Sequence, residues 1–177
     1  WLRQGHVPLS SSLGRLFDAA AGVLRVLDRS GHEGDAAMRL ESLATSSATP
    51  ATLPTPTTFS PLPTAASPSP LSVLDWRPLM RWVCDQPTTP ATQVTHAAAI
   101  FHLTLARDLA AWATEACLQQ GVDTVVLSGG CLANRLLDNA LMHQLSATGL
   151  RVLRATHCPC GDGGLSLGQA WVAHQRL

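Results

Sequence analysis

Apolar side chains recur at three- and four-residue steps over long stretches of the chain, which predicts amphipathic helices. The first stretch, SLGRLFDAAAGVLRVLDR at 12–29, has serines at 10–12 available as caps. After an SGH break, EGDAAMRLESLA at 33–44 resumes the helical spacing. A third helix is expected over 92–120, ending at Gly121 in a left-handed C-cap. Its expected polar face comprises His96, Arg107, Asp108 and Glu115.

After the third helix, the pattern alternates between strands and helices. VDTVVL at 122–127 predicts a short strand that is apolar on both faces, as in a sheet covered on both sides. LRVLRA at 150–155 predicts a second strand. An SGG loop and a helix over 132–147 follow the first strand, whereas THCPCGDGG and a helix over 165–177 follow the second. This order predicts a parallel or mixed sheet with ligand loops at the carboxyl ends of its strands.

Residues 45–70 interrupt this organisation. They are rich in Pro, Thr, Ser and Ala, carry hardly a charge and show no apolar period. Such a composition favours a flexible, partly polyproline linker or a surface insertion. It separates a helical segment, 1–44, from a C-terminal α/β segment, 71–177. Because the first residue is Trp1 and not Met, we expect a piece of a longer protein or a processed product.

Composition and charge narrow the classes of function. The 177 residues are 46% hydrophobic, with twelve basic and twelve acidic side chains, which is enough apolar material for one globular core. The formal net charge is zero, so the chain lacks the excess of positive charge that is typical of proteins that bind nucleic acid or an anionic membrane. No apolar stretch approaches the roughly 20 residues of a membrane helix, and no secretory pattern opens the chain. Five irregularly spaced cysteines are typical of free thiols in a cytoplasmic protein.

The SGG loop offers the first candidate site. Gly129 and Gly130 lack Cβ atoms, so the backbone can turn sharply and present its N–H groups to a ligand beside the positive end of the following helix. That arrangement suits phosphate. The amide of Asn134 could reach a sugar hydroxyl or a base. A plain strand-to-helix connection would explain the two glycines equally well.

Two carboxylates and one histidine are further candidates. Asp162 precedes two glycines and a helix, where it would either cap that helix or hold a metal ion that balances phosphate charge. Asp18 lies on the first predicted helix and could face solvent or accept bonds from ribose hydroxyls. His102 stands among apolar neighbours, which is more typical of a packed histidine than of a catalytic one.

The HCPC run raises the question of zinc. His157, Cys158 and Cys160 supply three ligands in a Cys-x-Cys spacing, which is a poorer zinc pattern than paired Cys-x-x-Cys. A zinc site is therefore not predicted there.

Six blocks of sequence, taken together, resemble the C-terminal end of HypF-type carbamoyltransferases, the family that matures nickel-iron hydrogenases. In order they are SSSLGRLFDAAAGVL, HEGDAAMRLESLA, LDWRPLM, AAIFHLTLARDLA, VVLSGGCLANRLL and GDGGLSLGQAWVA. The resemblance implies the actin-like ATPase class of fold, shared with sugar kinases and heat-shock ATPases. This chain would be an incomplete half-domain of that class, a mixed sheet with flanking helices.

The resemblance also implies an activity and its partners. In the family, upstream domains of the same polypeptide use carbamoyl phosphate and ATP to make carbamoyl adenylate. The C-terminal domain then passes the carbamoyl group to the C-terminal cysteine of the acceptor protein HypE. The matching motif positions imply these roles: Asp18 for the ribose, Gly34 for the nucleoside, Gly129, Gly130 and Asn134 for the nucleotide pocket, and Asp162 for a divalent metal ion.

Two departures from the family pattern limit what this chain is expected to do alone. The family's metal site also uses a pair of histidines at helix spacing, which has no counterpart in this sequence, and CPCG replaces a loop that usually has Pro and Asn before Asp162. We therefore expect half of a nucleotide cleft, with an unpaired sheet edge, that cannot complete carbamoyl transfer.

Two other classes of function remain open. One is the nucleotide-binding half of an antibiotic O-carbamoyltransferase or of a small-molecule kinase. The other is a non-catalytic relative that is kept for protein binding.

Overall fold

The computed structural model describes residues 10–47, 53, 59–62 and 71–176. In chain order, its elements are α1 (Leu13–Val23), α2 (Asp35–Thr45), β1 (Phe59–Leu62), β2 (Leu71–Leu74), α3 (Arg77–Cys84), α4 (Ala91–Gln120), β3 (Thr124–Leu127), the 3-10 turn η2 (Gly130–Ala133), α5 (Arg135–Ala147), β4 (Arg151–Arg154), the 3-10 turn η3 (Asp162–Gly164) and α6 (Leu165–His174).

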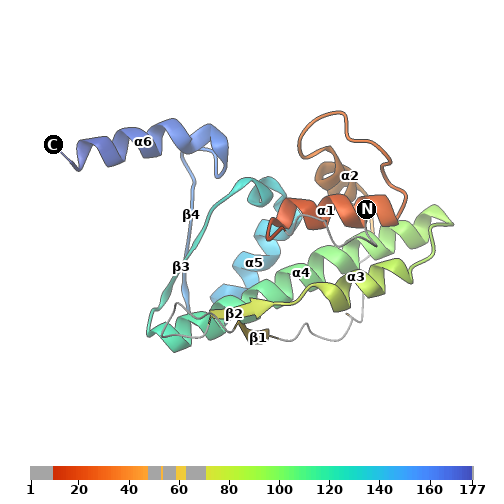
Figure 1. The fold of residues 1–177 in the computed structure, drawn as a ribbon, viewed down its shortest axis with the longest axis horizontal. Coiled ribbons are helices and arrows are strands. Elements are labelled where there is room, and N and C mark those ends of the chain that lie inside the picture. Colours follow the sequence, from red (N-terminus) through yellow and green to blue (C-terminus); the bar gives the residue numbers. More distant parts are fainter. Residues whose placement is uncertain (1–9, 48–52, 54–58, 63–70, 177) are drawn as a thin grey trace.

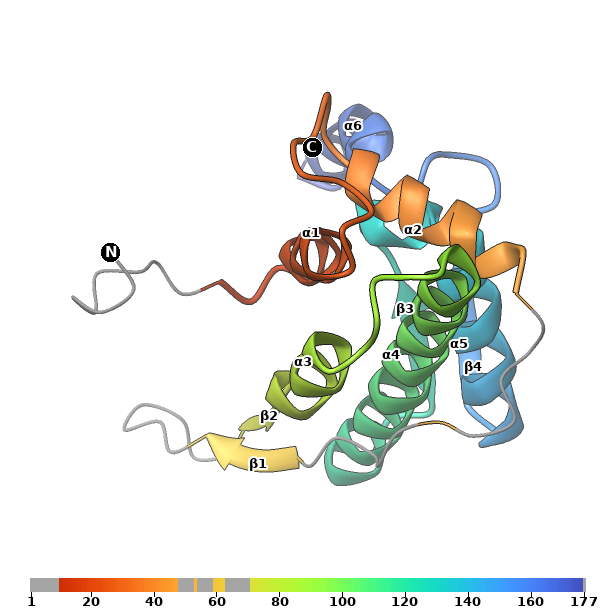
Figure 2. The ribbon, with the colours of Figure 1, turned by 90° about the vertical axis from the view of Figure 1, so that its right-hand side faces the viewer.

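Helix α4 is the centre of the fold. Helices α2, α3 and α5 all contact it, and Figure 2 shows α3 on one side of α4 and α5 on the other. Its buried face is rich in alanine, and such small side chains let the neighbouring helices approach closely. The helix ends at Gly121 with φ 64°, so the predicted left-handed C-cap is confirmed. The largest fully buried apolar side chains of the core are Phe17, Leu24, Leu40, Leu79, Val83, Phe101, Leu105, Leu137 and Leu145.

The predicted parallel sheet is present but small. Strands β3 and β4 pair in parallel, with Val125 opposite Val152, and α5 connects them. The prediction of a sheet covered on both faces is wrong, because Val126 in the middle of β3 is 66% exposed. In the part of the chain that the structure describes, each strand has one partner only, so the expected unpaired edge is found.

The first helix ends earlier than its apolar pattern predicts. The pattern continues to residue 29, but α1 stops at Val23 because Arg25 adopts a left-handed conformation with φ 55°. The Arg25 N–H then donates to Gly22 O, and the Val26 N–H donates to Ala21 O at 2.9 Å. These two bonds form a Schellman motif in which arginine stands where glycine is usual.

Two other expectations need correction. Asp108 was expected on the polar face of α4, but its side chain is buried and accepts a bond from Arg107 Nε at 2.7 Å. Within the Pro/Thr/Ser-rich segment, residues 59–62 form β1, which pairs in antiparallel fashion with β2. The sequence pattern predicted no strand there. Most of 45–70 lies outside the described residues, so its role as a linker or insertion stays a prediction.

The last helix stands apart from the core. Figure 1 shows α6 beyond the end of β4 and away from the helical body. The helix buries none of its residues, and it exposes Leu165, Leu167 and Trp171. Among the described helices, none is both long enough and apolar enough to cross a membrane.

The packing around α4 leads to a stability prediction. Replacing the fully buried Leu105 with alanine leaves a cavity, so Leu105→Ala should lower the free energy of unfolding by about 2–5 kcal/mol. Leu118→Ala is a matched control on the same helix, because Leu118 is 73% exposed, and it should change that free energy by less than about 0.5 kcal/mol. Urea unfolding of residues 1–177 measures both values. Equal effects of the two substitutions would contradict this placement of α4.

Candidate functional site

The loops that follow β3 and β4 touch each other at the carboxyl end of the sheet. The Gly129 N–H donates to Cys160 O at 2.7 Å, and Ser128 Oγ donates to the same carbonyl at 3.4 Å. Gly161 lies so close that a Cβ there would stand 3.0 Å from Gly130 Cα. The structure therefore brings together Gly129, Gly130 and the loop of Asp162, as the alternation of strands and helices predicted.

The glycine-rich loop, residues 128–133 between β3 and Asn134, presents free backbone donors. Gly129 has φ 111°, a conformation that side chains rarely allow, and the turn η2 starts directly after it. Leu132 N–H donates to Gly129 O, whereas in the described structure the N–H groups of Gly130 and Cys131 donate to no protein acceptor. Two adjacent free N–H groups at the start of a turn can bind an anionic oxygen.

The start of α5 is different, because its N–H groups are already used. Glu41 on α2 accepts from the N–H of Arg135 at 2.7 Å and from the N–H of Leu136 at 3.4 Å. Asn134 Oδ1 accepts from the N–H of Leu137 at 3.0 Å. The expectation that this helix start offers its positive end to phosphate is therefore wrong: a carboxylate and an amide of the protein occupy it.

Asn134 faces the interior. It is 6% exposed, and its Nδ2 lies 2.9 Å from Nε2 of the fully buried His102. His102 Nδ1 lies 2.8 Å from Ala98 O, and burial lowers the pKa of this histidine. His102 is thus a packed residue, as expected. Nδ2 and Oδ1 of Asn134 can each make one more hydrogen bond, and its role at the nucleotide stays a prediction.

Asp18 and Gly34 lie on the helices that flank this loop. Asp18 is half-buried, accepts from Arg15 Nη1 at 2.8 Å, and is close enough to Cys131 to influence the pKa of that thiol. Burial is the main cause that raises the pKa of Cys131. Gly34 is the exposed N-cap of α2, with φ 80° and open space around its Cα. The structure places Asp18 near the glycine-rich loop, whereas among the described residues no backbone hydrogen bond links Gly34 to that loop.

Asp162 lies on the second loop with an exposed side chain. The carboxylate caps neither η3 nor α6, so the helix-cap alternative is wrong. Within the described residues, no group of three or more His, Cys, Asp and Glu side chains is close enough to hold a metal ion. Asp162 alone does not make a metal centre, and Cys158 and Cys160 are free thiols.

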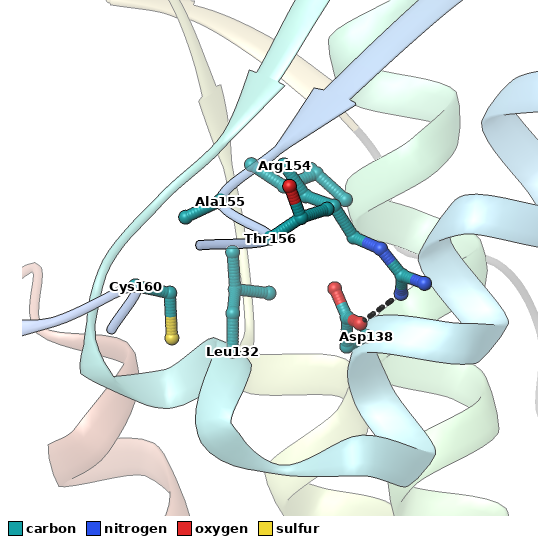
Figure 3. Close-up of a pocket in the computed structure, with 7 residues that line it drawn as sticks. Leu132, Asp138, Arg154, Ala155, Thr156 and Cys160 are labelled. Carbon is teal, nitrogen blue, oxygen red and sulfur yellow. Dashed lines mark hydrogen bonds and ion pairs between the residues drawn. The ribbon is translucent and has the colours of Figure 1, made fainter. Parts of the chain in front are cut away.

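A cavity of about 340 Å³ lies between the end of β4 and the start of α5 (Figure 3). Arg154 Nη1 pairs with Asp138 Oδ2 at 2.5 Å across it. Sequence reasoning missed both residues, although Arg154 lies near the end of the second predicted strand, 150–155, where ligand contacts concentrate in such sheets. The lining residues are Leu127, Leu132, Asp138, Arg154, Ala155, Thr156 and Cys160.

Comparison with known proteins shows which family this chain belongs to. Residues 1–169 match the family described as carbamoyltransferase, Kae1-like domain, second subdomain. The chain is 39% identical to carbamoyltransferase HypF2 of Cupriavidus necator, over 97% of this chain and 23% of that protein. It is 36% identical to carbamoyltransferase HypF of Rhizobium leguminosarum bv. viciae, over 95% of this chain and 20% of that protein.

Solved structures agree with this match. A full-length HypF in its phosphate- and nucleotide-bound form aligns with a TM-score of 0.72 at 33% identity, over 94% of this chain and 21% of that one. HypF of T. kodakarensis aligns with a TM-score of 0.74 at 31% identity, over 97% of this chain and 21% of that one. This chain thus spans less than a quarter of the length of each of these four relatives. It belongs to the HypF carbamoyltransferase family and matches the second subdomain of the family's Kae1-like domain.

Proposed function

We propose that this chain forms one wall of the nucleotide cleft in which a HypF-type enzyme transfers a carbamoyl group. The substrate would be carbamoyl adenylate, made from carbamoyl phosphate and ATP by other domains of the polypeptide, and the acceptor would be the C-terminal cysteine of HypE. The fold of the complete domain would be of the actin-like ATPase class. One solved relative is a full-length HypF in a phosphate- and nucleotide-bound form, which supports the choice of a nucleotide as the ligand.

The contact between the two loops is the observation that supports this proposal best. The bond from Gly129 to Cys160 O holds the glycine-rich loop and the Asp162 loop side by side. A nucleotide at this edge would meet backbone donors from one loop and a carboxylate from the other. The N–H groups of Gly130 and Cys131 would bind its anionic oxygens, because a fixed donor needs no reorganisation when charge develops.

The other predicted residues complete the proposal. Asp18 would accept from the ribose, Gly34 would lie along the nucleoside, and Asn134 would shape the pocket behind the loop. Asp162 would supply one ligand of a divalent metal ion, and other parts of the polypeptide would supply further ligands, because the described residues hold no group of three or more His, Cys, Asp and Glu side chains that could bind a metal ion. Such an ion, when bound, neutralises phosphate oxygens. The role of this chain is to hold and orient the mixed anhydride for attack by the thiolate of the acceptor.

A chimera tests the proposed function. The matching segment of the Cupriavidus necator HypF2 is replaced by residues 1–177, and carbamoyl transfer to HypE is measured with carbamoyl phosphate and ATP. The chimera should transfer, because the loops and their contact supply the missing wall, whereas residues 1–177 alone should not. Transfer by the chain alone would contradict the half-cleft interpretation, and a well-folded but inactive chimera would contradict the proposed function.

The role of Asp162 is tested in the same chimera. Asp162→Asn removes a charge from the loop and should lower transfer by at least about tenfold, with a higher demand for Mg²⁺. Asp123→Asn is the matched control, because this exposed carboxylate lies directly before β3, at the opposite end of the strand from the loops. It should leave transfer unchanged. An equal Mg²⁺ dependence of the two variants would exclude Asp162 as a ligand.

The contact between the loops makes a separate prediction for residues 1–177. The Cβ of Gly161→Ala would stand 3.0 Å from Gly130 Cα and 3.3 Å from its nitrogen, so the loops must move apart. The Gly129 N–H should then exchange with solvent roughly fivefold faster or more, since it loses its acceptor. Gly168→Ala is the control, because nothing lies within 4 Å of its Cβ position. Unchanged exchange at Gly129 in Gly161→Ala would show that the loops are not in contact.

A further inference from the structure

A buried histidine stands directly behind the glycine-rich loop. His102 on α4 is fully enclosed, with the rings of Phe17 and Phe101 at centroid distances of 5.3 Å and 5.8 Å. Both of its nitrogens have partners: Nδ1 lies 2.8 Å from Ala98 O, and Nε2 lies 2.9 Å from Asn134 Nδ2. Its position excludes contact with bulk solvent, so any effect on a ligand must act through Asn134.

The partners determine where the imidazole proton lies. The Ala98 carbonyl can only accept a hydrogen bond, so Nδ1 must carry the proton. Nε2 is then an acceptor, and the Asn134 Nδ2–H donates a hydrogen bond to it. This in turn directs Asn134 Oδ1 towards the N–H of Leu137, from which it accepts at 3.0 Å. The hydrogen bonds run in one direction, and rotating the amide by half a turn would break two of them at once.

The same short stretch of backbone connects this network to the free donors. Asn134 directly follows η2, and its N–H donates to Cys131 O at 3.2 Å. The free N–H groups of Gly130 and Cys131 belong to the same turn. Glu41 holds the next two N–H groups, those of Arg135 and Leu136. The direction of the free donors therefore depends on where Asn134 is held.

We propose that His102 is a positioning residue: as a neutral imidazole with its proton on Nδ1, it fixes the Asn134 amide and so sets the direction of the loop N–H groups that bind the nucleotide. The nucleotide part of this statement rests on the proposed function. The network itself does not, because its geometry is complete without a ligand. His102 on α4 thus acts through Asn134, which lies 32 residues later in the sequence.

The buried surroundings of His102 favour this neutral form. Burial lowers the pKa of His102, and it outweighs Glu41 on α2, which acts in the opposite direction. From α1, the neighbour is the uncharged ring of Phe17, and from α5 it is the neutral amide of Asn134. The folded-state pKa of His102 lies below the unfolded value of 6.5. The neutral imidazole therefore makes its full contribution to the free energy of unfolding above pH 6.5, and this contribution is lost as the pH falls towards the folded-state pKa.

Nitrogen NMR of residues 1–177 tests the network without any ligand. At pH 7, His102 should be neutral with a protonated Nδ1 and a bare Nε2, and a scalar coupling should link Nε2 to the amide nitrogen of Asn134. Asn134→Asp replaces that donor with an acceptor, so it should raise the pKa of His102 and drive a proton onto Nε2. His96, exposed on the same helix, is the internal control and should not respond. A proton on Nε2 of the unaltered chain at pH 7 would overturn the proposal.

Variants of His102 then separate positioning from packing. His102→Leu removes both hydrogen bonds, whereas His102→Gln keeps one donor and one acceptor on a side chain of similar reach. In His102→Leu, the Leu137 N–H should exchange faster and carbamoyl transfer by the chimera should fall at least about tenfold, while His102→Gln should restore most of both. His96→Leu on the same helix should change neither.

The outcomes of these variants are distinguishable. Equal losses in folded His102→Leu and His102→Gln, as judged by circular dichroism, would mean that His102 only fills space, and they would overturn the proposal. If the unaltered chimera is folded but transfers no carbamoyl group, the proposed function fails. The NMR signature and the Leu137 exchange rates still decide whether His102 positions the loop.

Discussion

The hydrogen bonds at the start of α5 hold together three parts of the chain that are far apart in sequence. Glu41 reaches this point from α2 and accepts from the N–H groups of Arg135 and Leu136. His102 reaches it from α4 and bonds to Asn134, at the junction between η2 and α5. The bonds of Asn134 to His102 and to the N–H of Leu137 are buried, and buried polar groups without partners are costly, so these bonds help to hold α4 and α5 together. The position of the glycine-rich loop depends on this junction, because the last residues of the loop belong to it.

The remainder of the molecule is divided into a packed side and an open side. Alanines on α4 and the leucines of α2 and α5 form a continuous core on one face of the small sheet. On the other face, Val126 and Leu153 are exposed, and α6 adds further exposed apolar side chains. An apolar surface of this kind marks a place where another part of a protein packs. This is consistent with a chain that spans less than a quarter of each relative named above.

The sequence predicted those elements whose cause is local. Gly121 ends α4 where its αL conformation was expected, and alternating strands and glycine loops predicted the parallel pair and the meeting of its loops. The features that the sequence did not predict depend on distant parts of the chain or on an unusual backbone conformation. Arg25 ends α1 in a conformation that favours glycine, and Asp108 is buried because of how α4 packs. Glu41 lies 94 residues before the N–H that it caps, so no spacing rule could find it.

That cap also changes the electrostatics of the site. A helix start usually attracts a phosphate through its free N–H groups and its dipole, but here a carboxylate of the protein already satisfies them. A second anion beside Glu41 would be repelled, so the anionic groups of a nucleotide would not be placed at the start of α5. The donors left for them are the N–H groups of Gly130 and Cys131, one turn earlier in the chain. Because the helix start serves internal structure, the loop stands on a rigid base, which is what the proposed site for a reactive mixed anhydride would require.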